Sequence, residues 1–171
     1  FGREALNSTI DPYNTGIGER SMRENTTGTL NTAIGSVSLT SNTSGDFNCA
    51  LGAFSLNQNE TGAENVAIGA SALKDNTTGS ANTAVGHTAM VFSPNGSDNT
   101  ALGWESMYGV FGSSAAGSNN TAVGSSALRS NELGNFNVAI GAHALEFNTG
   151  SSSTNVAVGS FAAAGNTTGQ F

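Results

Sequence analysis

A 17-residue sequence unit recurs nine times along this 171-residue chain, and it limits the fold more than any other feature. With the leading Asn counted as position 1, the unit is N-[TV]-A-[ILV]-G-x-x-[AS]-[LM]-x-x-N-x-T-G-x-x. The copies are 17 residues apart five times and then 21, 17 and 18 apart; they start at Asn14, Asn31, Asn48, Asn65, Asn82, Asn99, Asn120, Asn137 and Asn155. A fixed short period predicts a repeat architecture, and helical repeats of about 30 residues or more do not fit it.

The first part of each copy is typical of a short strand. Position 4 is always aliphatic and position 2 is always Thr, Val or Cys, and the two share one face because side chains alternate along a strand. Position 3 is Ala in eight copies and Gly16 in the first. We expect positions 2 and 4 to face the core and the small residues at position 3 to pack closely against another chain. Position 9, Leu or Met in eight copies and Ala163 in the last, is expected to close the core from a second short strand.

The remaining consensus positions indicate corners. Position 5 is Gly in all nine copies, which favours a positive φ or a close backbone approach. The N-x-T-G tails combine Asn and Gly as turns do. Stacking the coils would place the nine position-1 asparagines above one another in a structural ladder of side-chain amides.

These features predict an all-β, mostly parallel β-solenoid of about nine to ten 17-residue coils. The whole chain, 1–171, would be a single repeat domain, with a partial coil at 1–13, nine coils over 14–171 and a loop insertion near 108–116. With parallel strands about 4.8 Å apart, such a stack would form a rod roughly 40 Å long.

The expected core is thin, and this predicts association between chains. Each coil supplies about two large aliphatic side chains, whose burial must offset the conformational entropy lost by 17 residues. A neighbouring chain covering the small-residue face would add the missing packing. The sequence therefore favours intertwined or side-by-side chains, such as a homotrimer, over a lone monomer.

Charge and cysteine content exclude several classes of partner. The net charge is −7 with only five Lys and Arg, which argues against nucleic acid and against anionic membrane surfaces. The single cysteine, Cys49, cannot form an internal disulfide and is interpreted as a small buried hydrophobe. No apolar run is long enough to span a bilayer, so no membrane insertion is expected in this segment. Because the chain opens within a repeat, at "FGREAL", we expect it to be a segment of a longer protein.

The motif "NVAIGASAL" at 65–73 and its copies resemble the NSVAIG-x-x-S head repeats of trimeric autotransporter adhesins of the YadA type. They are also similar to the NTAIG…AL…NTTG arrays of bacteriophage tail-fibre proteins. The resemblance covers essentially the whole chain, although the 17-residue unit is longer than the usual adhesin head repeat. It implies a left-handed parallel β-roll in which three chains wind about one axis. It also implies an extracellular role as a stiff fibre segment on a cell surface or a virion.

Catalytic motifs are weak in this sequence, and we expect no enzymatic activity, cofactor or metal. Ser71 and Lys74 match the S-x-x-K pattern, but they occupy ordinary repeat positions without the partner motifs. His87 and His143 lie in different copies with no third ligand at metal spacing and are interpreted as surface residues.

The candidate contact site lies where the repeat is interrupted. The copy starting at Asn99 carries four extra residues and gathers Trp104, Tyr108 and Phe111. Insertions in solenoids become loops on one face, and aromatic residues on a Ser-, Thr- and Asn-rich surface are typical of a contact with a host-surface glycan or protein. The alternative is that the aromatic residues fold back as a plug over a neighbouring coil or chain.

Three alternative interpretations remain. The N-x-[ST] sequons at position 12, Asn25, Asn42, Asn59, Asn76 and Asn166, are either a by-product of the turn or glycan attachment sites. The solenoid could be a filament subunit that stacks end to end. The Thr row at position 2 suggests ice binding, but Cys49 and three valines interrupt it and it shares a face with the aliphatic residues, so burial explains it better.

Overall fold

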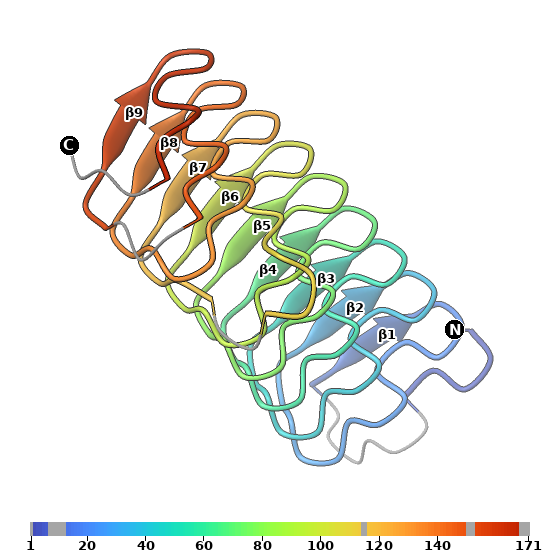
Figure 1. Cartoon of the computed structure of the whole chain (residues 1–171). Coiled ribbons are helices and arrows are strands. Elements are labelled where there is room, and N and C mark those ends of the chain that lie inside the picture. Colours follow the sequence, from blue (N-terminus) through green and yellow to red (C-terminus); the bar gives the residue numbers. More distant parts are fainter. Residues whose placement is uncertain (1, 7–12, 114–115, 150–152, 168–171) are drawn as a thin grey trace.

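The computed structural model describes residues 2–6, 13–113, 116–149 and 153–167, and over these ranges it is an all-β rod (Figure 1). Nine three-residue strands form one parallel sheet in chain order. They are β1 (Thr15–Ile17), β2 (Thr32–Ile34), β3 (Cys49–Leu51), β4 (Val66–Ile68), β5 (Thr83–Val85), β6 (Thr100–Leu102), β7 (Thr121–Val123), β8 (Val138–Ile140) and β9 (Val156–Val158). No described residue is helical. The predicted parallel β-solenoid is confirmed.

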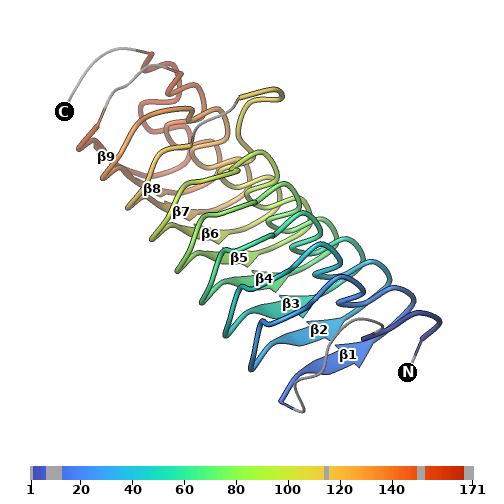
Figure 2. The ribbon, with the colours of Figure 1, turned by 90° about the horizontal axis from the view of Figure 1, so that it is seen from below.

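Each strand pairs with the next at identical repeat positions. In β3 and β4, for example, Ala50 lies beside Ala67 and Leu51 beside Ile68. The register survives the four-residue insertion, since Ala101 of β6 still pairs with Ala122 of β7. The strands therefore stack along the axis of the rod, with β1 and β9 at opposite ends (Figure 2).

The second strand expected around position 9 is absent from the described residues. Position 9 lies instead in turns with positive φ, such as 47° at Leu39 and at Leu56. These turns are held to the following coil by backbone hydrogen bonds, for example from Leu39 N to Ser55 O at 2.9 Å. The coil thus closes through stacked turns rather than through a second sheet.

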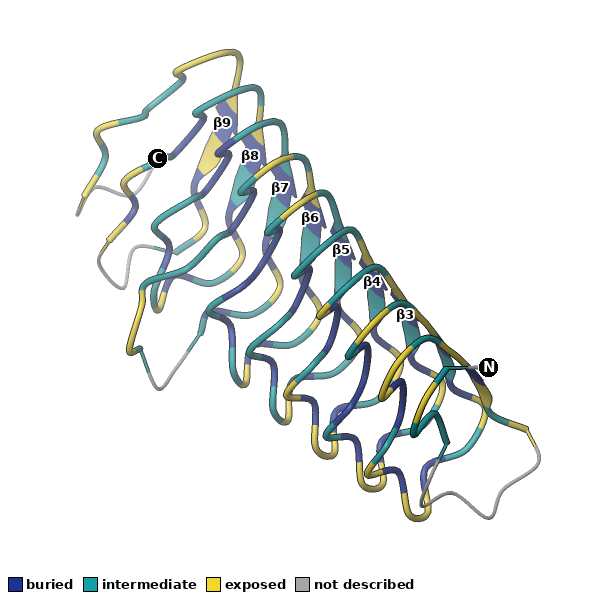
Figure 3. Cartoon of the chain, turned by 90° about the vertical axis from the view of Figure 1, so that its right-hand side faces the viewer, coloured by how far each residue is buried: buried dark blue, intermediate teal, exposed yellow. Residues whose placement is uncertain are grey.

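The two faces of the strands are the reverse of those expected. The position-3 alanines are buried inside the coil, while the side chains at positions 2 and 4 are exposed or half-buried on the outside (Figure 3). The buried Leu and Met of position 9 and the position-3 alanines belong to one core cluster, so a methyl group meets a large side chain across the coil. A 17-residue coil encloses too little space for large side chains on both walls. The prediction that position 3 faces another chain is therefore wrong.

The position-5 glycines meet both conditions expected of them. Gly69 has a φ of 130°, and a Cβ there would lie 2.5 Å from the carbonyl oxygen of Gly86 in the next coil. At position 15 glycine is required only because there is no space for a side chain, since a Cβ on Gly62 would lie 2.3 Å from Gly79 O. Both rows let successive coils approach at sheet spacing.

Within the expected partial coil at 1–13, residues 1 and 7–12 lie outside the described residues, as do 114–115 of the insertion. The described part of the first segment pairs with the following coil, since Arg20 N donates to Arg3 O at 2.8 Å and Leu6 N to Ser21 O at 3.0 Å.

Candidate interaction surfaces

The position-1 asparagines form a ladder inside the rod. Asn65 N donates to Asn48 Oδ1 at 3.0 Å, and Asn65 Nδ2 donates to Gly79 O at 2.9 Å. The main-chain link, from each position-1 N–H to the preceding Oδ1, recurs from Asn31 to Asn155. It crosses the insertion as well, where Asn120 N donates to Asn99 Oδ1 at 2.9 Å. These residues have a structural role, because they satisfy backbone groups that the coil buries.

A second asparagine ladder lies at position 12, where sequence reasoning placed only turns and sequons. Asn42 Nδ2 donates to Asn25 Oδ1 at 2.7 Å and to Gly45 O at 2.9 Å. Asn59 and Asn76 repeat both bonds in the following coils.

This second ladder bears on the candidate glycosylation sites. Asn25, Asn42, Asn59 and Asn76 are fully buried, and the nitrogen to which a glycan would be joined is already hydrogen-bonded in each. A glycan therefore cannot be attached to these four asparagines in the folded chain. This favours the interpretation that the sequons follow from turn chemistry. Asn166 is half-buried in the last described coil.

The outward side of the sheet, here called the aliphatic face, is a candidate surface that extends over all nine strands. It consists of the position-4 residues Ile17, Ile34, Leu51, Ile68, Val85, Leu102, Val123, Ile140 and Val158, flanked by the residues at position 2. Cys49 belongs to the flanking row and is half-buried rather than in the core. Because successive strands pair in register along the rod (Figure 1), the position-4 residues follow one another in a single row. A continuous apolar surface of this kind is typical of an interaction site.

The insertion gathers some of the expected aromatic residues. Phe92, from the preceding coil, packs edge-on against Tyr108 and Phe111 with ring centroids 5.1 and 5.2 Å apart. The guanidinium of Arg129 lies 5.3 Å from the Tyr108 ring centroid, and its Nε donates to Glu105 Oε2 at 2.8 Å. Sequence reasoning missed Phe92, although "FSPNG" at 92–96, which replaces the usual N-x-T-G turn, marks the place.

Trp104 lies apart from this aromatic cluster. It follows Gly103 at the end of β6, is 51% exposed, and makes no ring contact with any residue that the structure describes. The insertion therefore brings Tyr108 and Phe111 together through Phe92 and leaves Trp104 beside the sheet.

The residues considered for catalysis or metal binding do not gather into one site. His87 is exposed, whereas His143 stacks on Phe161 at 4.7 Å and its Nδ1 lies 3.0 Å from Glu146 Oε2. Lys74 Nζ lies 3.8 Å from Asp75 Oδ1. Within the described part of the chain, no three His, Cys, Asp or Glu residues are grouped to hold a metal ion, and no helix has the length and hydropathy to cross a membrane.

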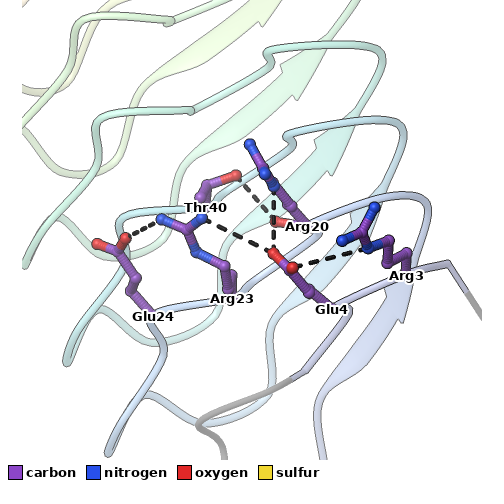
Figure 4. A network of polar contacts seen from close by, with 6 residues as sticks. All are labelled: Arg3, Glu4, Arg20, Arg23, Glu24 and Thr40. Atoms are coloured by element: carbon purple, nitrogen blue, oxygen red, sulfur yellow. Dashed lines mark hydrogen bonds and ion pairs between the residues drawn. The ribbon is translucent and has the colours of Figure 1, made fainter.

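Three of the five basic residues surround Glu4 at the β1 end (Figure 4). Arg20 Nε donates to Glu4 Oε2 at 3.2 Å, while Arg3 and Arg23 lie 3.8 and 3.9 Å from its carboxylate. A hydrogen bond to Glu24 raises the pKa of Arg23 above its usual value. These ion pairs join the first described segment to the following coil and add little stability because they are exposed.

Comparisons with protein-family models, with curated proteins and with solved structures found no match to this chain. The function of its surfaces has to be inferred from their own chemistry.

Proposed function

We propose that the chain is a non-enzymatic structural rod, a segment of an extracellular fibre on a cell surface or a virion, in which three copies associate through their aliphatic faces. The observation that carries this proposal is the row of outward aliphatic side chains along all nine strands. Covering the row would remove a large apolar area from water, which is the main driving force for association. The left-handed, three-chain arrangement implied by the adhesin and tail-fibre resemblance is part of the proposal.

The oligomeric state tests this function directly. Sedimentation equilibrium of the unmodified chain is expected to give about 51 kDa, three times the chain mass of 17.1 kDa. A variant with Ile34→Lys and Ile68→Lys places two charges on the aliphatic face and is expected to sediment as a folded monomer. The matched control is Leu133→Lys, since Leu133 is 48% exposed outside the strands. A folded monomer from the unmodified chain would overturn the trimer.

A filament is the alternative assembly. Within the part of the chain that the structure describes, the outer edges of β1 and β9 have no strand partner in the sheet, and such edges promote pairing with other copies. End-to-end stacking would give particles whose length increases with protein concentration, and electron microscopy separates these from a closed trimer of fixed length.

Ice binding is a second candidate function, and the outward direction of position 2 favours it. Thr15, Thr32, Thr83, Thr100 and Thr121 all face away from the core in register, with four Cys or Val interruptions in the row. Thr and Val share a β-branched shape, so the valines keep a methyl group in line with the row. The test compares the thermal hysteresis of the unmodified chain with that of the Ile34→Lys, Ile68→Lys variant at the same concentration, because the two lysines interrupt the face. Equal hysteresis of the two chains would exclude this function.

A further inference from the structure

A small cleft lies where the insertion loop folds back along the rod. Its volume is about 260 Å³, and its lining includes Gln58, Asp75, Thr77, Phe92, Pro94 and Phe111. The described part of the loop, yellow in Figure 2, projects from the side of the rod away from the strands. The cleft therefore stays open when the aliphatic face is covered.

The repeat places the floor of the cleft in register. Gln58, Asp75 and Phe92 all occupy position 11 in three successive copies, and Phe92 forms a parallel bridge with Gly109 at the same position of the next. At about 4.8 Å per coil, the row from Gln58 to Phe92 spans about 10 Å along the rod. The floor is thus a straight strip with amide, carboxylate and aromatic groups in order.

The polar part of this floor, together with Thr77, has hydrogen-bonding groups that are not all satisfied by the protein. Gln58 Nε2 donates to Asp75 Oδ1 at 3.0 Å, and Thr77 Oγ1 donates to Pro94 O at 2.8 Å. Gln58 Oε1 and Asp75 Oδ2 have no hydrogen-bond partner among the described residues. Two acceptor oxygens on neighbouring coils are therefore available for hydroxyl groups of a ligand.

The aromatic end of the floor, Phe92, meets Phe111 of the insertion. The rings of Phe92 and Phe111 meet at 83°, so they form a corner rather than a stack. Phe111 is 84% exposed although it lines the cleft. Its uncovered face is available for contact with a flat apolar surface.

We propose that this cleft binds a neutral carbohydrate of one or two pyranose rings. The C–H face of a pyranose would lie against Phe111, and vicinal hydroxyls would donate to Gln58 Oε1 and Asp75 Oδ2. The volume lies just below the range usual for drug-sized ligands, which limits the occupant to a mono- or disaccharide unit. The site goes beyond the structural role proposed above and does not depend on trimer formation.

The charge around the cleft favours a neutral ligand over a cation. Aromatic corners with a carboxylate also bind quaternary ammonium groups. Here, however, Lys74 Nζ lies 3.8 Å from Asp75 Oδ1 and offsets the charge of the carboxylate. The hydroxyl groups of a neutral sugar can donate to Gln58 Oε1 and Asp75 Oδ2, and this does not require the Asp75 carboxylate to lack a neighbouring positive charge.

The proposal is tested by saturation-transfer NMR and calorimetry. The ligands are a panel of methyl glycosides and disaccharides of glucose, galactose, mannose and N-acetylglucosamine, and choline chloride is the cationic probe. We expect at least one sugar to bind with a dissociation constant of about 1 mM, a weak affinity suited to a small open cleft. Phe111→Ala should weaken that binding at least about tenfold, and Asp75→Asn should weaken it less because an amide oxygen remains.

Phe136→Ala and Trp104→Ala are the matched controls, because both aromatic side chains are more than half exposed and neither lines the cleft. Both should bind sugar as the unmodified chain does, and circular dichroism of all four variants checks that each is folded. Three results would overturn the site: no saturable binding by any sugar of the panel, equal binding by folded Phe111→Ala, or binding of choline alone.

Discussion

Every polar group of the Asn65 side chain, and its backbone N–H, is hydrogen-bonded within its own coil or to the coils on either side. Its N–H and Nδ2 donate to Asn48 Oδ1 and Gly79 O, and its Oδ1 accepts from the N–H of Asn82 at 3.0 Å. The residue is fully buried, so none of these groups can exchange a protein partner for water. Asparagine suits the position because one short side chain supplies both a donor and an acceptor.

Replacing Asn65 by Ala should therefore lower the free energy of unfolding by about 1–3 kcal/mol, because Asn82 N–H and Gly79 O lose their partner in a dry site. Asn65→Asp should be worse at neutral pH, since it keeps the acceptor but buries a charge and loses the donor. Urea denaturation followed by circular dichroism measures both. An Asp variant as stable as the native chain would show that water reaches the ladder.

Gly69→Ala should destabilise the rod severely, by about 3 kcal/mol or more, because the new Cβ meets a backbone oxygen at 2.5 Å and the residue keeps a φ of 130°. Gly165→Ala is the matched control, since a Cβ there has no atom within 4 Å. Thermal unfolding of the two variants gives the comparison. If the two variants have the same melting temperature, close contact between coils is not the reason that position 5 is glycine.

At the scale of the strand, the sequence predicted the period, the parallel pairing and the corner glycines, but not which face is inward. Alternation shows that Val66 and Ile68 share a face opposite Ala67; it does not say which face encloses the smaller space. The core here is so narrow that Ala67 fits it and Ile68 does not. Phe92 escaped prediction for a related reason, because its role arises only when the insertion of a later copy folds back onto it.

Ala67→Leu should unfold individual chains rather than merely separate them, because Ala67 is fully buried within its own coil. Overpacking such a site costs about 1–3 kcal/mol. The drop in unfolding midpoint should be the same at all protein concentrations, whereas loss of an intermolecular contact would make it depend on concentration. Ile68→Ala is the outward control, and its effect is expected mainly on sedimentation. Folded Ala67→Leu monomers would contradict this assignment.

At the scale of the whole molecule, the rod is a stack in which each coil contacts its neighbours. The sheet and the position-1 ladder both continue through the copy that carries the insertion. Gly117 also returns to the position-15 row, where its carbonyl accepts from Asn99 Nδ2 at 2.9 Å. The extra residues thus leave and rejoin the coil without shifting its register.

Deleting residues 110–113, which brings this copy back to 17 residues, should leave the circular dichroism spectrum unchanged and shift the melting temperature by no more than about 5 °C. The same deletion removes Phe111 and should abolish sugar binding. Collapse of the fold on deletion would show instead that the loop is a plug on which the neighbouring coils depend.

The register is the same on both sides of the insertion, so the loop can vary in sequence without changing the shape of the rod. Stacking of the rod depends on Asn, Gly and Ala at fixed positions, whereas the segment between Gly109 and Gly117 leaves and rejoins a single coil and lies outside this pattern. We therefore expect that loops of other lengths and sequences can be grafted between these two glycines while the rod keeps its fold, so that the proposed contact site could change independently of the proposed assembly.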